Sequence, residues 1–508
     1  MRPPYPLRGR HSSRRALLVF LALAGSAGLL TSCGAQPAPP PQTTQVILLA
    51  SSTGGDEPSS FGVGLASLTL NNDAGQSVSV FNYPNCQNGT ITSFPCLDVE
   101  FMHLNARLSL PLLTVTIPQD TYTSATLTVG VCSFQTLGVA WNGGFGSAFY
   151  LDGLCEIGTP QAGEATVNLP APITITGSSM FLSLNLQVPQ SYTLTGSGCT
   201  LGGGGGPPNP CSYTISPVFT LTPIQIDAVP TNTQNGLETG IIAVVDSVSG
   251  SSFTADTTDA AAVTFSTSPA TQYQGIAGLS SLKASMPVQI DTAIHPDGSL
   301  LATRVEADDP TAPYWGFGLV QSTYPPWGTF DFQSEWAGGF PSGWGPCGRY
   351  DTADSTFKVS GEFTNVNKLP FTPTFDLLSM FPGQNIAVFL STSACTSYPS
   401  PPADMVVLTP QTVNGTVWSL SSSNGFTVYN VTLAPDDMIT NLQGLAGLYS
   451  PLKSPSTVFV YADSNTQLLN TDVINAGSVE RFHGLLFDDN GTLRMDCDEI
   501  MPGVNPES

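Results

Sequence analysis

The chain has 508 residues and a formal charge of −23, with 50 glycines, 43 prolines and only 10% charged residues. This length allows several domains, and the composition favours strands joined by turns over long helices. The negative charge would repel phosphate backbones, so it argues against a nucleic-acid partner.

The amino terminus has the layout of a signal peptide. Five arginines lie in residues 1–15, and residues 16–30 form an apolar run of 15 residues. A membrane helix needs about 20 apolar residues, whereas the apolar part of a signal peptide needs about 7–15. We therefore predict that residues 1–32 are removed. The mature chain would keep 14 − 5 = 9 basic and 37 acidic residues, a net charge of 9 − 37 = −28.

The apolar run ends in Leu30, Thr31, Ser32 and Cys33, which resembles the lipobox of bacterial lipoproteins. The resemblance implies that Cys33 carries lipid and anchors the protein in the cell envelope. Because no aspartate follows Cys33, it also implies the outer membrane, on its periplasmic or its surface face. An ordinary cleavage site with an incidental cysteine is the alternative. Residues 33–45 are rich in proline and are expected to be an extended tether.

Residues 46–226 are expected to form a β-sandwich. Apolar and polar residues alternate over 124–131 and 181–188, which is typical of half-buried strands. Further strands are expected at residues 44–50, 62–70 and 167–175. Segments 116–130 and 218–226 resemble an uncharacterised prealbumin-like sandwich domain, which is common at the front of bacterial lipoproteins and brings no catalytic residues with it.

The rest of the chain contains a predicted repeat. The segment TQYQGIAGLSSLK at 271–283 returns as TNLQGLAGLYSPLK at 440–453, and hairpin signals precede both copies. With a degenerate middle copy, this predicts three OB-like β-barrel modules at 234–310, 313–410 and 411–502. The first copy, with its closing hairpin at 297–306, resembles a second uncharacterised family of exported bacterial proteins. In the last copy, residues 488–496 are expected to supply that hairpin.

Nine cysteines follow Cys33, and disulfides are the expected state in an exported chain. Cys497 is left without a partner when neighbours in sequence are paired as Cys86–Cys96, Cys132–Cys155, Cys199–Cys211 and Cys347–Cys395. The sequence does not prove these pairings. It has no C-x-x-C motif and only three histidines beyond the signal, which argues against a zinc site. We predict no metal and no other cofactor.

The segment from 314 to 350 is rich in aromatic residues and contains Trp315, Trp327, Trp336 and Trp344. Flat aromatic faces presented on Gly/Pro loops can stack on sugar rings, so these four side chains are the candidate ligand contacts. The alternative is that they fill a core or a domain interface, because aromatic side chains bury large areas. Phe330 and Phe332 alternate and are expected in the core.

No catalytic site is marked by the sequence. It lacks a G-x-S-x-G elbow, and His103, His295 and His483 are expected to be structural, with His295 in a turn. The acidic residues near the aromatic segment have no spacing that places two of them for glycoside cleavage: Glu335, Asp351 and Asp354. Residues 488–499 hold five carboxylates without EF-hand spacing, and a solvated hairpin is expected there.

These patterns predict a non-catalytic, lipid-anchored cell-envelope protein that serves as a binding or structural module. Its expected partners are the membrane, through the lipid, and a polysaccharide or another envelope protein. The alternative function is a secreted hydrolase that acts on envelope or extracellular polymers.

Overall fold

The computed structural model is nearly all β-structure, which confirms the predicted fold class. The helical elements named within the described part of the chain are 3-10 turns of three residues each, such as η2 at Leu279–Ser281. In the part of the chain that the structure describes, no helix is long and apolar enough to cross a membrane. The described residues are 42–53, 58–84, 86, 97–102, 104, 110–142, 145–154, 163–195, 212–230, 235–257, 262–339, 348–392, 400–434, 437, 439, 456–469, 471 and 473–503. The predicted signal peptide and most of the tether lie outside them.

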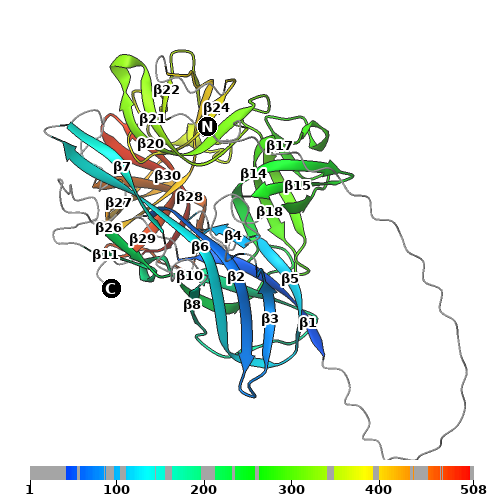
Figure 1. Ribbon diagram of the computed structural model, residues 1–508. Helices are drawn as coiled ribbons and strands as arrows, with labels where there is room; N and C mark the ends of the chain where they lie inside the picture. The colour runs from blue at the N-terminus through cyan, green and yellow to red at the C-terminus, as the bar shows by residue number, and fades with distance from the viewer. Residues whose placement is uncertain are drawn as a thin grey trace, which may run out of the picture. The chain divides into compact units, whose positions relative to one another are not determined.

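The first domain is one hydrogen-bonded sheet of eleven strands around a shared apolar core, with a separate two-stranded ribbon, β11–β12 (Figure 1). Its main path runs in the order β3-β2-β6-β8-β13-β10-β1-β5. So many strands stay in one sheet only because the sheet curls over its own core. The strands are β1 Thr43–Ser52, β2 Pro58–Asn72, β3 Ser77–Asn82, β4 Leu97–Glu100, β5 Pro111–Pro118, β6 Thr121–Asn142, β7 Phe145–Leu154, β8 Gly163–Asn168, β9 Ile173–Thr174, β10 Ser179–Leu186, β11 Tyr192–Thr195, β12 Ser212–Ile215 and β13 Val218–Ile224.

Strand β1 corrects the predicted start of this domain. It begins at Thr43, inside the predicted tether, because Thr43 and Thr44 already pair with the end of β5. The strand is also buried on both faces: Val46 and Leu48 belong to the sandwich core, while Ile47 and Leu49 pack with the first module. Burial on two faces accounts for a continuous apolar run in place of alternation. The strand predicted at 167–175 is split between β8 and β9.

Three modules follow, and each is built on one small sheet. Module 1 has β14 Leu237–Ser249, β15 Ser252–Thr257, β16 Val263–Ser266, β17 Gln272–Gln274, β18 Pro287–Ile294 and β19 Leu300–Glu306. Module 2 has β20 Tyr314–Tyr324, β21 Thr329–Gly338, β22 Arg349–Asp351, β23 Thr356–Val359, β24 Asn385–Leu390 and β25 Met405–Leu408. Module 3 has β26 Gln411–Ser423, β27 Phe426–Leu433, β28 Thr457–Leu468, β29 Val479–Asp489 and β30 Thr492–Pro502.

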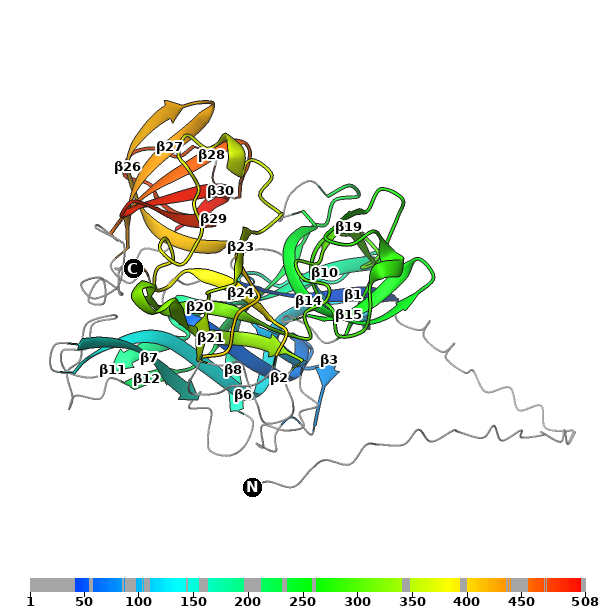
Figure 2. The ribbon, with the colours of Figure 1, turned by 90° about the horizontal axis from the view of Figure 1, so that it is seen from above.

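The modules share the strand connectivity of a five-stranded OB-like barrel. In module 3 the closed order is β26-β27-β28-β30-β29, and Figure 2 shows these strands curving round one core. Module 1 closes in the same order, with β16 parallel to β19, and module 2 places its strands likewise, with a bridge from Asp351 to Pro402. The predicted β-hairpin near 488–496 is formed by β29 and β30.

A β-bulge recurs in the first long strand of every module. It falls within a Val-x-Ser tripeptide whose middle residue is Asp246 in β14, Gln321 in β20 and Trp418 in β26. An extra residue at this point bends the strand and increases its twist. The bend helps the strand to pair on both sides of a small barrel, so the bulge is a structural feature shared by all three modules.

Candidate functional site

The structure separates the four candidate tryptophans. Trp315 is 2% exposed and lies in an apolar cluster with Phe317, against Ile242 and Val244 of β14. Trp336 is half-buried beside it, with the two ring centroids 4.8 Å apart. These two side chains therefore fill a contact between modules 1 and 2, and Trp315 is wrong as a ligand contact because its ring is covered. Trp344 lies outside the described residues.

Trp327 is different, because 65% of its surface is exposed. It ends η3, the 3-10 turn Pro325–Trp327 that joins β20 to β21. Two prolines fix the start of the turn, and Gly328 closes it in the left-handed region at φ 68°. The Thr352 hydroxyl donates to the Gly328 carbonyl oxygen at 2.8 Å, which ties the turn to the end of β22.

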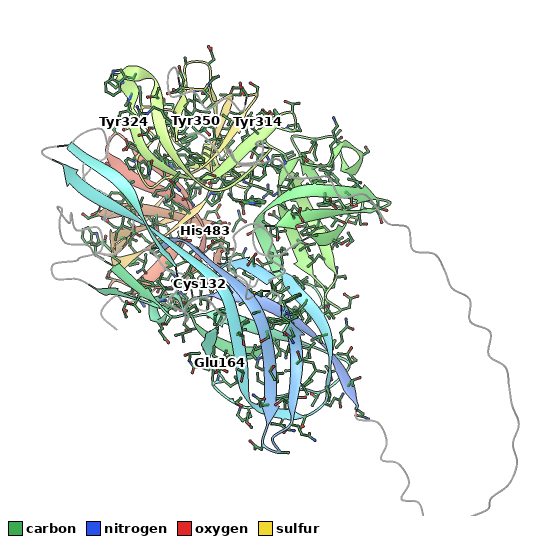
Figure 3. The ribbon with its side chains drawn as sticks, in the orientation of Figure 1. Cys132, Glu164, Tyr314, Tyr324, Tyr350 and His483 are labelled. Atoms are coloured by element: carbon green, nitrogen blue, oxygen red, sulfur yellow. The ribbon has the colours of Figure 1, made fainter. Side chains whose placement is uncertain are left out.

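The ring of Tyr324 supports Trp327. The two rings are stacked, with centroids 5.6 Å apart and planes 28° from parallel. The Arg349 guanidinium lies over the Tyr324 ring, with its central carbon 4.4 Å from the ring centroid. Figure 3 marks Tyr324 near the end of this hairpin. We call Tyr324, Trp327, Asp331 and Arg349 the Trp327 platform.

Asp331 links the polar groups of the platform through hydrogen bonds. It accepts from Arg349 through both oxygens, with Nε to Oδ1 at 2.5 Å and Nη2 to Oδ2 at 3.0 Å, and from the Tyr324 hydroxyl at 2.8 Å. The Asp331 hydrogen bond raises the pKa of Arg349 despite partial burial, and burial together with Asp331 raises the pKa of Tyr324. The guanidinium of Arg349 therefore stays charged and the phenol of Tyr324 stays protonated at neutral pH.

Strand alternation explains why these groups meet. Asp331 lies opposite Arg349 where β21 pairs with β22, and Phe330 lies opposite Tyr350. Phe330, Phe332 and Tyr350 point into the module core, which confirms the prediction for both phenylalanines. Successive residues of a strand face opposite sides. The charged pair therefore lies on the outer face, next to the exposed turn.

His295 lies in a turn, as predicted, the structural role of His483 stays a prediction, and His103 lies outside the described residues. His295 is in the turn between β18 and β19, where its carbonyl oxygen accepts from Gly298 N at 2.8 Å. His483 lies in β29, is 8% exposed, and places Nδ1 2.8 Å from Asp498 Oδ1. Glu499 lies opposite His483 in the ladder. A histidine oriented by a carboxylate is found in catalytic triads and in structural pairs alike.

The solvated hairpin predicted at 488–499 is wrong for three of its carboxylates. Asp488, Asp496 and Glu499 are 7%, 6% and 0% exposed. For Asp496, module 2 covers the neighbouring strand β28: the rings of Phe371 and Tyr461 pack with centroids 5.1 Å apart, and the Asn365 amide donates to Asp463 at 2.7 Å. Tyr461 is the ladder neighbour of Asp496. Burial, with the charges of Asp498 and Asp463, raises the pKa of Asp496 to about 7.

A second buried charge cluster surrounds Arg304, which is 7% exposed. Its Nε and Nη2 donate to Asp291 at 2.7 and 3.0 Å, and Nη1 pairs with Glu306. Glu362, from the connection after β23, lies 4.0 Å from Nη2. Burial alone would lower the pKa of Arg304, but Asp291, Glu362 and Glu306 outweigh it and raise that pKa. Sequence analysis missed this cluster, although Arg304 and Glu306 two residues apart in one strand are a visible signal.

The cysteine predictions are tested only in part. Cys497 is a buried free cysteine, as expected for the residue left without a partner. Cys86 and Cys132 are buried, and each of them is disulfide-bonded. Their predicted partners, Cys96 and Cys155, lie outside the described residues, so those pairings stay predictions. Five more cysteines also lie outside the described residues, so the predictions for them stay predictions: Cys33, Cys199, Cys211, Cys347 and Cys395.

The described residues contain no group of three or more His, Cys, Asp or Glu side chains placed to hold a metal ion. The side chain of Glu335 is not among those described. Asp351 ends β22 and accepts from Ala353 N at 2.9 Å, and Asp354 is exposed in the turn that follows. The Trp327 platform combines an exposed aromatic ring with a carboxylate and a guanidinium, and these groups are suited to binding a ligand by stacking and hydrogen bonding.

Part of the chain matches a known protein family. No curated protein matches the chain. Residues 243–306, from β14 to the end of β19, match the model of DUF5666, a domain of unknown function, and this stretch includes Asp291, Arg304 and Glu306. Module 1 is thus similar to the DUF5666 domain over most of its strands.

Proposed function

We propose that this protein is a non-catalytic, lipid-anchored module of the bacterial cell envelope that binds polysaccharide through the Trp327 platform. One observation carries the proposal: Trp327 is a large apolar ring, 65% exposed, held on a rigid turn beside a fixed carboxylate and guanidinium. An exposed aromatic ring with convergent polar groups is the usual arrangement at a ligand site.

The position of the platform in the module supports this proposal. The β20–β21 turn is the connection between the first and second strands of an OB-like barrel. In OB-folds, this connection and the one between the fourth and fifth strands are where oligosaccharides and oligonucleotides bind. The acidic charge of −23 disfavours nucleic acid, which leaves sugar polymers as the ligand class.

The Trp327→Ala variant tests this function. We expect the variant to lose about 2- to 12-fold in affinity for an insoluble β-linked polysaccharide, since a stacked aromatic ring contributes about 0.5–1.5 kcal/mol beyond its buried area. Sedimentation of the full chain with cellulose or chitin measures the binding. Trp418→Ala is the matched control, because it removes another exposed indole, one that is 58% exposed on β26. Equal losses in both variants would contradict a site at Trp327.

The proposed lipid anchor is tested separately. Mass spectrometry of the mature amino terminus should show a peptide that begins at Cys33 and carries acyl chains. Replacement of Cys33 by Ser should release the protein from membranes, because each buried methylene contributes about 0.8 kcal/mol to anchoring. An unmodified Cys33, or cleavage at another residue, would overturn the proposed location.

Secreted hydrolase activity is the second candidate. The pair of His483 and Asp498 favours it, because a carboxylate that orients a histidine is part of many nucleophilic sites. Purified protein and its His483→Ala variant can be compared for reducing ends released from envelope polymers. Release that the variant lacks would favour the hydrolase, whereas no release from either protein would leave binding as the function.

A further inference from the structure

The Trp327 platform offers no uncompensated positive charge to a ligand. Its one cation, Arg349, is held by both oxygens of Asp331. Two further carboxylates, Asp351 and the exposed Asp354, add negative charge at and just after the end of β22. Over residues 313–410 the sequence has 3 basic and 7 acidic residues, which gives 3 − 7 = −4. The electrostatic potential at the platform is therefore negative.

We infer that the platform selects uncharged β-linked pyranose polymers and disfavours polyanionic ones. This inference rests on the proposed polysaccharide binding and adds the class of polymer. A β-linked pyranose with equatorial hydroxyls presents an apolar C–H face, which fits the flat, exposed Trp327 ring. The hydroxyls at the rim of the sugar ring can donate a hydrogen bond to the Asp331 carboxylate and accept one from the Arg349 guanidinium. Each carboxylate or phosphate on a polymer would instead meet a negative field.

The fixed geometry of the polar pair strengthens the inference. Arg349 attracts an anion only weakly while it stays paired, because Asp331 compensates its charge by accepting from Nε and Nη2. The Tyr324 hydroxyl also donates to Asp331, so this carboxylate is a shared acceptor for two neighbours and cannot easily turn away. Breaking a bidentate, charge-assisted pair would reduce the gain from binding an anionic group.

Two polymers with the same backbone test the inference: hydroxyethyl cellulose, which is uncharged, and carboxymethyl cellulose, which is anionic. The full-length mature chain is run through native gels that contain either polymer, and the retardation gives an apparent affinity. We expect at least about tenfold tighter binding to the neutral polymer at low ionic strength. The difference should shrink at 0.5 M salt, because added salt screens the repulsion.

The Asp331→Asn variant gives a second measurement. Loss of this carboxylate frees the Arg349 charge, so retardation by carboxymethyl cellulose should increase at least about threefold. Asp73→Asn is the control, because it makes the same change of charge at an exposed turn of the first domain. Equal or tighter wild-type binding to the anionic polymer would overturn the inference and leave the binding function standing. Retardation by neither polymer would overturn both.

Discussion

The Arg304→Ala variant is expected to lose about 3–5 kcal/mol of stability in module 1, because removing one partner leaves buried charges uncompensated. Asp291, Glu306 and Glu362 would then face one another without the guanidinium that now lies within 4.0 Å of all three. Native-state hydrogen exchange at the amides of β18 and β19 measures the local free energy of opening.

Arg349→Ala is the control for this prediction. It also breaks a bidentate pair with an aspartate, but the Arg349 side chain is 46% exposed. Exposed ion pairs contribute about 0–1 kcal/mol, so we expect little change in exchange of the amides of β21 and β22. If both variants lost a similar free energy of opening, burial of the Arg304 cluster would not explain its contribution to stability.

The second large effect is expected at Asp496, whose pKa is raised from 3.8 to about 7 by burial and by Asp498 and Asp463. The folded state holds this proton more tightly than the unfolded state does. The contribution of Asp496 to stability is therefore greatest below pH 4, falls as the pH rises towards 7, and is constant above it. A shift of about three pKa units corresponds to a loss of at most about 4 kcal/mol.

Asp496→Asn should remove this dependence, because the amide fills the same space without a charge. We expect the variant to be more stable than the wild type at pH 8 and close to it at pH 4. Hydrogen exchange at β29 and β30, corrected for the intrinsic rate at each pH, measures the difference. Asp354→Asn, which changes an exposed carboxyl of module 2, is the control. A wild-type module 3 whose stability is unchanged between pH 4 and pH 7 would contradict the buried-proton account.

The sequence and the structure agree where the physical cause is local. Alternation placed Phe330 and Phe332 in the core, and both are buried. The hairpin signal near 488–496 gave β29 and β30. The cysteine pattern left out Cys497, which is a free cysteine. Each of these results depends on residues that are close in sequence, or on pairing cysteines that are neighbours in sequence. A single amino-acid sequence shows such short-range features directly.

The tertiary structure alone decided which aromatic and charged groups are exposed. Trp315 and Trp327 belong to the same aromatic segment, yet Trp315 is covered by β14 and Trp327 is 65% exposed on a turn. The carboxylates of 488–499 are predicted to be solvated by their composition, but residues more than 90 positions away cover the strand beside them. The Arg304 cluster likewise joins two strands and a distant loop.

By itself, the sequence determined the β-class of this protein, because strand periodicity and turn residues act within a few positions of the chain. The tertiary structure decided the location of the Trp327 platform and of the buried charge clusters. Exposure depends on which distant segment packs over a face, and that packing is set by long-range contacts that no short pattern encodes.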